Sequence, residues 1–227
     1  MIYFENVNKE YRGHKILDSI NITIEKGELV SIVGHSGAGK TSLIKLMLAE
    51  EKPTKGKVSF YSESIHDMKG RLLNDYRRKI GVVFQDFRLL PNRTAYENIA
   101  FAMEAAGKTD HEIKLDVPHV LDLVDLKSRM NSFPHELSGG EKQRVAIARA
   151  IVNKPSIIIA DECTGNLDRE NSIGILNILK EINKEGVTVI MATHDNEIIK
   201  LFPKRVIQLE NGKIVKDTKR EMYEDII

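Results

Sequence analysis

A glycine-rich segment carries the residue types that bind phosphate. Residues 34–41 read GHSGAGKT, which fits the pattern G-x-x-x-x-G-K-[ST], and they follow the apolar run 29–33. Glycines let backbone N–H groups converge on an anion, the next helix adds its positive N-terminal dipole, and Lys40 adds a mobile charge. A plain glycine-rich turn is the alternative, but the strand before and the helix after favour a phosphate-binding loop. The candidate ligands are Gly34, Ser36, Gly37, Ala38, Gly39, Lys40, Thr41 and Ser42.

A pair of carboxylates follows a second apolar run. Residues 157–160 read IIIA and lead into Asp161 and Glu162. Open α/β sheets bind ligands at the carboxyl ends of their strands, which is where this pair would lie. Beside a phosphate loop, Asp161 and the Thr41 hydroxyl are candidate ligands of Mg²⁺, and Glu162 is a candidate to polarise an attacking water. A solvated pair that caps the next helix is the alternative.

Residues 137–141, LSGGE, form a second candidate anion site. Ser138 and Glu141 have the spacing of a capping box, which explains these two residues locally. It does not explain Gly139 and Gly140, because glycine destabilises a helix start unless a group must approach the backbone closely. A serine hydroxyl and bare amides at a helix N-terminus can hold phosphate. Two half-sites in one chain predict a two-fold, head-to-tail homodimer that closes on two nucleotides.

The elements that position these residues alternate between strand-like runs and helical periodicity, which is typical of α/β folds. The runs VSIV, SIIIA and TVIMA are apolar on both faces, which predicts central parallel strands covered by helices. We expect strands at residues 2–7, 20–24, 29–33, 58–61, 80–84, 157–160, 188–192, 206–209 and 213–215, and helices at 41–50, 95–106, 140–152 and 172–184.

Two parts of the chain depart from this alternation. In residues 1–60, strand-like pieces separated only by turns predict an antiparallel β layer. Residues 87–153 contain no convincing strand, so we expect a mostly helical subdomain inserted into a core made of residues 1–86 and 154–227. Pro118 and Pro134 are expected to break this subdomain into pieces.

Composition excludes several classes of protein. The 227 residues are 41% hydrophobic and 30% charged, as in a globular domain with a real core. The 34 basic and 33 acidic residues leave a net charge of +1, so we expect no nucleic-acid partner. A single cysteine, and seven histidines without a pair at zinc-ligand spacing, predict a reducing compartment and no structural metal. The chain shows no apolar signal segment and no apolar stretch of ~20 residues, which predicts a soluble protein.

Four motifs, in their order along the chain, resemble those of ATP-binding subunits in the ATP-binding-cassette (ABC) family. They are GHSGAGKT, LSGGE, IIIADE and the histidine after TVIMA. The resemblance covers essentially the whole chain. It implies a P-loop NTPase (RecA-like) α/β core with an N-terminal antiparallel β layer and an inserted helical subdomain, and it implies hydrolysis of ATP with Mg²⁺. By the same resemblance, Tyr11 stacks on adenine and Gln85 links Mg²⁺ and the attacking water to the helical subdomain. Asp168 would face the opposite monomer, and His194 would hold the γ-phosphate and Glu162 in register.

Within that family, the segment FQDFRLLPNRTAYENIAFAMEAAGK is most similar to the ATPases of bacterial cell-division systems. This resemblance implies ATP-driven closure that controls peptidoglycan hydrolases through an integral membrane partner, with the chain peripheral at the cytoplasmic face of the plasma membrane. Apolar residues beside a polar motif independently favour an interface, and the contact candidates are Phe87, Arg88, Leu89 and Leu90.

Two alternatives stay open at this point. The run DE-x-TGNLD is shared with a wider group that includes lipoprotein-release ATPases and macrolide or antimicrobial-peptide export ATPases, which have the same chemistry and a different membrane partner. The apolar residues that follow Gln85 could also simply pack the helical subdomain.

The chain departs from the family pattern at His35 and Cys163, which both stand where the family often has proline. Neither change removes a catalytic group. Cys163 is interpreted as a small packing residue, because a free cysteine is usually buried. The alternative is a reactive thiol near the γ-phosphate.

Overall fold

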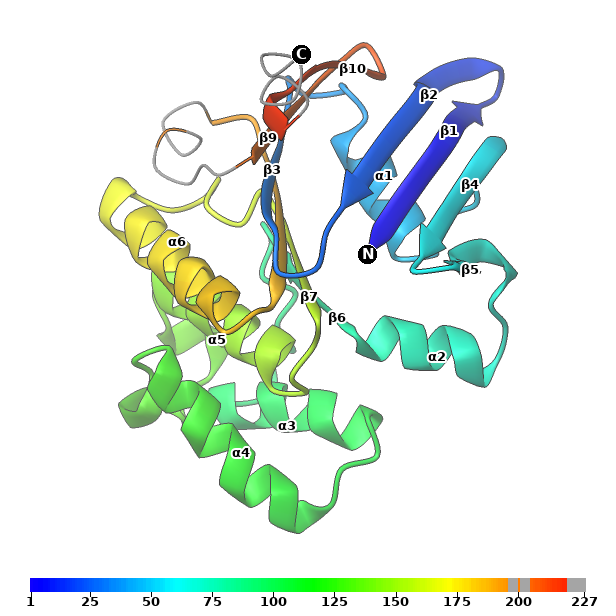
Figure 1. Cartoon of the computed structure of the whole chain (residues 1–227). Helices are drawn as coiled ribbons and strands as arrows, with labels where there is room; N and C mark the ends of the chain where they lie inside the picture. The colour runs from blue at the N-terminus through cyan, green and yellow to red at the C-terminus, as the bar shows by residue number, and fades with distance from the viewer. Residues whose placement is uncertain (196–199, 201–204, 220–227) are drawn as a thin grey trace. The chain divides into compact units, whose positions relative to one another are not determined.

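The computed structural model of the chain describes residues 1–195, 200 and 205–219 (Figure 1). The chain divides into two compact units, Met1–Arg77 with Thr188–Ile227 and Arg78–Val187. The predicted helical subdomain, residues 87–153, lies wholly within the second unit.

An antiparallel sheet opens the first unit, as the sequence predicts. Strand β1 (Ile2–Tyr11) lies between β2 (His14–Ile24) and β4 (Lys55–Phe60), and the short β5 (Glu63–Ser64) pairs with β4. Ile2 faces Ile24 on one side and Phe60 on the other. All three side chains are buried, so one face of this sheet contributes to the core of the unit.

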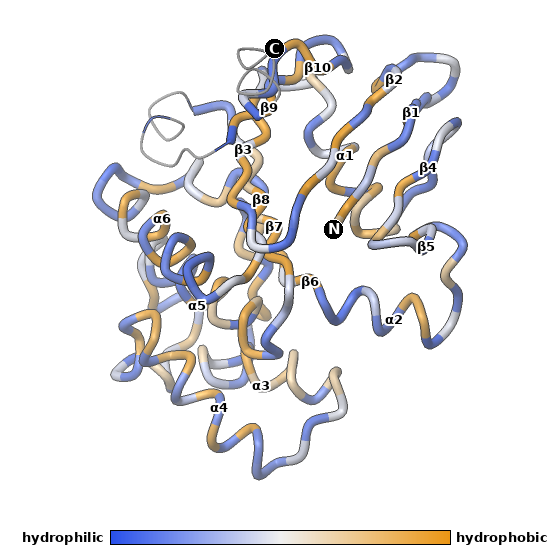
Figure 2. The backbone as a smooth tube through the Cα atoms, in the orientation of Figure 1, coloured by the Kyte–Doolittle hydropathy of each residue, from blue (hydrophilic) through white to orange (hydrophobic). Residues whose placement is uncertain are grey.

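The first unit also contains a parallel group of strands. Strand β3 (Leu29–Val33) pairs in parallel with β8 (Thr188–Thr193) and with β9 (Arg205–Glu210), and β10 (Lys213–Asp217) returns antiparallel to β9. Strands β3 and β8 are buried along their whole length and hydrophobic over most of it (Figure 2). Helix α1 (Lys40–Met47), the 3₁₀ turn η1 (Ile65–Asp67) and helix α2 (Arg71–Arg78) also start in this unit.

The second unit is built around helix α5 (Gly139–Ile151). Strand β6 (Ile80–Phe84) pairs in parallel with β7 (Ile157–Asp161), and α5 packs against β6. Helix α5 also contacts helices α3 (Ala95–Ala105), α4 (Asp110–Leu123) and α6 (Arg169–Lys184) (Figure 1). Its central residues Val145, Ala146, Ile147 and Ala148 are fully buried, which makes α5 the core helix of the unit. The 3₁₀ turns η2 (Lys127–Arg129) and η3 (Pro134–Glu136) complete it.

The prediction that Pro118 breaks the helical region is wrong. Helix α4 runs without interruption from Asp110 to Leu123 and contains Pro118 in its interior. A proline there removes one backbone hydrogen bond and costs about 3 kcal/mol. The helix tolerates this loss because it begins with a capping box of Thr109 and Glu112 and buries four apolar side chains, Ile113, Val117, Val120 and Leu121. Pro134 does stand at a boundary, as predicted, because it opens η3.

Candidate functional site

Close contacts or backbone conformation require the glycines of the loop after β3. A Cβ atom added at Gly34 would lie 2.4 Å from the carbonyl oxygen of Leu209. Gly39, the N-cap residue of α1, has a φ of 110°, and a Cβ there would lie 2.7 Å from a methyl group of Leu17. Gly37 has a left-handed φ of 84° and open space around it. Backbone conformation and packing therefore both demand glycine in this loop.

The side chain of Lys40 folds back into the glycine-rich loop. The residue is only 6% exposed, and its Nζ donates hydrogen bonds to the carbonyl oxygens of Gly34 (2.7 Å) and His35 (3.2 Å). Lys40 is the first residue of α1, where the leading amides lack acceptors within the helix. A buried ammonium beside such amides is suited to an anion.

His194 lies at the same sheet edge as the phosphate loop. Val33, the last residue of β3, is paired with Thr193, the last residue of β8. Gly34 and His194 therefore leave the sheet at neighbouring positions. His194 is exposed, and the backbone N–H of Asp195 donates to the Thr193 hydroxyl (3.1 Å), which holds the chain as it leaves β8.

Tyr11 is anchored by a carboxylate that the sequence analysis did not single out. The Tyr11 hydroxyl donates a hydrogen bond to Glu51, and the ammonium groups of Lys9 (3.0 Å) and Lys45 (3.1 Å) bind the same carboxylate. Burial alone would raise the pKa of Glu51, but these hydrogen bonds outweigh it and lower the pKa to about 2. Burial, and then the bond to Glu51, raises the pKa of Tyr11. The Lys9 ammonium also lies 4.7 Å from the centre of the Tyr11 ring.

In the second unit, strand pairing brings Gln85 and the carboxylate pair to one edge. Phe84 is paired with Asp161, so Gln85 and Glu162 follow neighbouring strand ends. Gln85 is held from both sides by Asn166: its Nε2 donates to Asn166 Oδ1 (3.2 Å), and Asn166 Nδ2 donates to the Gln85 carbonyl (3.3 Å). Glu162 has a left-handed φ of 49°, a conformation that is strained for a residue other than glycine.

The segment LSGGE opens α5 through the predicted capping box. The Glu141 amide donates to the Ser138 hydroxyl (3.2 Å), and the Ser138 amide donates to the Glu141 carboxylate (2.8 Å). The two glycines differ in their surroundings. A Cβ at Gly140 would lie 2.1 Å from Asn171 Oδ1, whereas at Gly139 its nearest contact would be a Leu167 methyl group at 3.4 Å.

Gly140 is thus explained within the chain by Asn171, a residue that the sequence analysis missed. Asp168 is the N-cap of α6, and its carboxylate accepts hydrogen bonds from the Asn171 amide (2.9 Å) and from Asn171 Nδ2 (2.7 Å). The bond from the Asn171 amide is the main reason that the pKa of Asp168 is lowered. Asp168 therefore fixes the side chain that occupies the space beside Gly140.

The three apolar residues that are predicted to contact the membrane partner are less exposed than an open interface would require. Phe87, Leu89 and Leu90 are half-buried, and Arg88 is exposed. The buried Asn98 shapes the next part of this loop, because its side chain exchanges hydrogen bonds with Leu90 in both directions (2.7 and 3.2 Å).

Cys163 is buried, with 2% of its surface exposed. Burial raises the pKa of its thiol to about 12. This environment agrees with the interpretation of Cys163 as a packing residue and argues against a reactive thiol.

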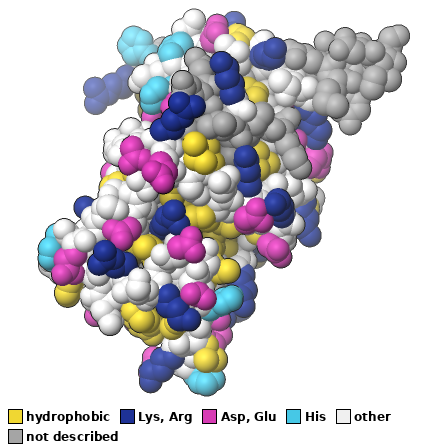
Figure 3. Space-filling view, turned by 90° about the vertical axis from the view of Figure 1, so that its left-hand side faces the viewer, with side chains coloured by type: hydrophobic (Ala, Val, Ile, Leu, Met, Phe, Trp, Pro, Cys, Tyr) yellow, Lys and Arg dark blue, Asp and Glu magenta, His cyan; other side chains and the backbone are white. Residues whose placement is uncertain are grey.

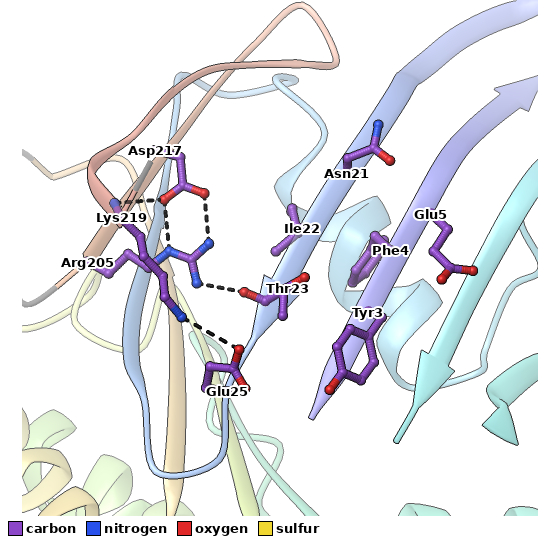
Figure 4. Close-up of a pocket in the computed structure, with 10 residues that line it drawn as sticks. All are labelled: Tyr3, Phe4, Glu5, Asn21, Ile22, Thr23, Glu25, Arg205, Asp217 and Lys219. Atoms are coloured by element: carbon purple, nitrogen blue, oxygen red, sulfur yellow. Dashed lines mark hydrogen bonds and ion pairs between the residues drawn. The ribbon is translucent and has the colours of Figure 1, made fainter. Parts of the chain in front are cut away.

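A pocket of about 550 Å³ in the first unit is separate from these motifs (Figure 4). The buried Arg205 at its wall is bound by Asp217 (2.7 and 2.8 Å), the Thr23 carbonyl (2.7 Å) and Glu28 (3.0 and 3.1 Å). Lys219 bridges to Glu25 at 3.8 Å. Because these polar groups bind one another, the network ties β9 and β10 to the end of β2.

The face of the molecule drawn in Figure 3 carries acidic and basic side chains interspersed with one another. Within residues 1–195, 200 and 205–219, no group of three or more His, Cys, Asp or Glu side chains could hold a metal ion. None of the helices in the described ranges is long and apolar enough to cross a membrane.

The chain is similar to known proteins over nearly its whole length. The model of the protein family described as "ABC transporter" matches residues 17–165. The "Cell division ATP-binding protein FtsE" of Bacillus subtilis (strain 168) is 51% identical over 224 residues, covering 98% of each chain. The protein of the same name from Escherichia coli (strain K12) is 45% identical over 215 residues, covering 94% of this chain and 97% of the other.

A solved structure, described as a dimeric post-hydrolysis state of an ATP-binding cassette bound to ADP and Pi, matches with a TM-score of 0.86. It is 35% identical and covers 96% of this chain and 97% of its own. These similarities confirm the resemblance of the motifs and the predicted P-loop NTPase fold. The chain belongs to the ABC transporter family, in which it is an ATP-binding subunit that hydrolyses ATP to ADP and phosphate.

Proposed function

We propose that this chain is the ATPase subunit of a bacterial cell-division complex of the FtsE–FtsX type. In this proposal, ATP-driven closure of a homodimer acts through an integral membrane partner on peptidoglycan hydrolases outside the cell. The observation that carries it is the identity of 45–51% to proteins named FtsE over nearly their whole length. The chain would lie at the cytoplasmic face of the plasma membrane, bound to its partner.

ATP is proposed to bind through the phosphate loop and Tyr11. The Lys40 ammonium, buried against the loop carbonyls, would turn from them to the β- and γ-phosphates. The amides that open α1 would hold the phosphate oxygens, and the half-exposed ring of Tyr11 would stack on adenine. The residues proposed for this role are those of the loop from Gly34 to Ser42 that the motif identifies.

Hydrolysis is proposed to depend on Glu162, His194 and Gln85. Glu162 would accept a proton from the attacking water, and His194 would hold the γ-phosphate in register with it. Gln85 would orient that water. Mg²⁺ would neutralise charge on the β- and γ-phosphates. Its proposed ligands, Thr41, Asp161 and Gln85, are all oxygen donors with a single carboxylate, which suits an ion that keeps waters and phosphate oxygens as its other ligands.

The second half of each site is proposed to come from the partner copy. Ser138, Gly139, Gly140 and Glu141 would complete the phosphate cage, and Asp168 would lie near the opposite monomer. The geometry of α5 supports this role: the Ser138 oxygen accepts from the Glu141 amide, so its own hydrogen can point to a phosphate. The dimeric state of the similar cassette bound to ADP and Pi also supports it.

The membrane partner is proposed to contact the loop after Gln85, through Phe87, Arg88, Leu89 and Leu90. These residues combine half-buried apolar side chains with an exposed guanidinium. A cytoplasmic segment of an FtsX-like protein would cover them.

Purification of the tagged chain from its native membrane tests the division role. We expect it to bring down a protein with four membrane spans and a large extracellular loop. A complex with a substrate-bearing exporter would replace the proposal with the export alternative.

Glu162→Gln tests the hydrolytic site independently of the membrane partner. This change keeps the size of the side chain and removes its basicity, so the variant should bind ATP, accumulate a dimer and lose most turnover. Gel filtration coupled to light scattering, with and without ATP, measures the dimer. Normal hydrolysis by this variant would contradict the role of Glu162.

A further inference from the structure

Two consecutive residues in the loop after Gln85 have a left-handed backbone. Phe87 has a φ of 58° and Arg88 a φ of 48°. This conformation is strained for residues that carry a Cβ, and a bulky aromatic residue is an outlier in it. Local hydrogen bonds from the Phe87 amide to Phe84 (3.3 Å) and from the Arg88 amide to Asp86 (2.6 Å) accompany the turn.

Arg149 on α5 binds both carbonyl groups of this strained pair. Its guanidinium donates to the carbonyl oxygen of Phe87 at 2.8 Å and to that of Arg88 at 2.5 Å. Hydrogen bonds from a charged donor are roughly twice as strong as those between neutral groups. The planar guanidinium fork gives each carbonyl its own nitrogen donor at a fixed spacing, whereas a lysine would have to share one ammonium between them.

The segments on both sides of the strained pair have anchors of their own. Gln85 is held by Asn166, which follows the carboxylate pair. Leu90 is held by Asn98 on α3. Arg149 therefore restrains the middle of the loop, and it does so from the core helix whose first turn carries Ser138 and Gly140.

We propose that Arg149 is a positioning residue for Gln85: it holds Phe87 and Arg88 in their left-handed turn and thereby links the Gln85 loop to the helix that begins at LSGGE. The inference rests on the proposed role of Gln85 in hydrolysis. Arg149 itself touches neither nucleotide nor water in this proposal. Its loss should therefore slow turnover and leave ATP binding intact.

Hydrogen–deuterium exchange of the whole chain tests the structural half of the proposal. In Arg149→Gln, a peptide covering residues 84–90 should exchange about tenfold faster, while a peptide covering α1 should be unchanged. Arg144→Gln is the matched control, because Arg144 also lies on α5 but binds Val124 and Asp125 (both 3.2 Å). Unchanged exchange of residues 84–90 in Arg149→Gln, or equally fast exchange in Arg144→Gln, would overturn the proposal.

Steady-state ATP turnover by the same variants tests the positioning half. Arg149→Gln should lower kcat about tenfold and change the KM for ATP by less than about twofold, since binding and turnover depend on different residues. Arg149→Lys should restore only part of kcat, because a lysine keeps the charge but lacks the planar fork that places one nitrogen on each carbonyl. A rise in KM that matches the fall in kcat would show a general structural defect and overturn the proposal.

A rescue experiment separates strain relief from loss of a contact. Glycine adopts the left-handed region freely, so Arg88→Gly in the Arg149→Gln background should restore much of kcat. Arg88→Ala removes the same side chain without freeing the backbone and should not restore it. If glycine rescues no better than alanine, the proposal is wrong.

Failure of this inference and failure of the proposed function have different signatures. These measurements use the isolated chain and no membrane partner, so the loss of the division role would leave them valid. If Gln85→Ala turns over ATP normally, the proposed role of Gln85 fails, whereas the exchange of residues 84–90 still reports on Arg149.

Discussion

The hydroxyl of Tyr11 donates a hydrogen bond to the carboxylate of Glu51. Glu51 also binds the ammonium groups of Lys9 and Lys45, and Lys45 lies in the last turn of α1, the helix that the phosphate loop opens. The aromatic ring proposed to stack on adenine is thus connected to the phosphate-binding helix. We therefore expect Glu51 to support nucleotide binding by holding Tyr11 in place.

Tyr11→Phe should weaken ATP binding about two- to tenfold, since it keeps the ring and removes an anchoring hydrogen bond worth about 0.5–1.5 kcal/mol. Inorganic tripolyphosphate should bind both proteins equally, because it has no base to stack. Titration calorimetry with the two ligands measures the difference. Equal weakening for both ligands would contradict a role of the ring in binding adenine.

The stability of the fold should depend on pH through the carboxylate of Glu51. The folded state lowers the pKa of Glu51 from 4.5 to about 2, so its contribution is fully present above about pH 5 and is lost as the pH falls toward 2. Its side chain is 22% exposed, so we expect about 1 kcal/mol, or roughly 3 °C in Tm. The Tm difference between the wild type and Glu51→Gln should be largest near neutral pH and shrink in acid. A difference that stays constant from pH 7 to pH 3 would contradict this assignment.

Cys163 should resist alkylation in the native protein. With a thiol pKa of about 12, the reactive thiolate is scarcer at pH 8 than in a free cysteine by roughly a thousandfold, and burial limits access further. Iodoacetamide labelling followed by mass spectrometry should show modification only after unfolding in urea. Rapid labelling of the folded chain that ATP blocks would instead support the reactive-thiol alternative.

Asp217→Asn should destabilise the first unit strongly. Removing one partner of a buried ion pair leaves an incompletely compensated charge, which costs about 3–5 kcal/mol, and Glu28 still binds Arg205, so we expect about 3 kcal/mol. Asp18→Asn is the control, because Asp18 pairs with Lys15 and Lys213 nearer the surface, so this change should lower the free energy of unfolding much less than Asp217→Asn does. Urea unfolding followed by circular dichroism compares the two. An equal loss of unfolding free energy in the two variants would show that burial of the Arg205–Asp217 pair does not add to stability.

Local pattern was enough to predict most elements of the fold. The apolar runs that became β3, β7 and β8 stand out because strands covered on both faces must be apolar throughout. Helix α4 was missed and its proline misjudged, because the burial of Ile113, Val117 and their neighbours outweighs a local rule. Propensity describes the isolated segment, whereas packing decides the folded one.

The supports of the candidate site could not be predicted in this way. Glu51 meets Tyr11 across 40 residues of sequence, and Arg149 meets Phe87 across 62. A carboxylate or a guanidinium with no motif around it looks like any other charged surface residue. The sequence also gives no sign that Asn171 fits beside Gly140, because only the packing of α5 against α6 brings these residues together.

The amino-acid sequence by itself determined the phosphate loop, the capped start of α5 and the order of strands and helices, because each depends on residues close together in the chain. Only the tertiary structure decided which side chains hold these motifs in place: Glu51 under Tyr11, Asn166 on Gln85, and Arg149 on the strained turn. The physical reason is that hydrogen bonds and close packing require atoms to meet in space, and residues far apart in sequence meet only after folding.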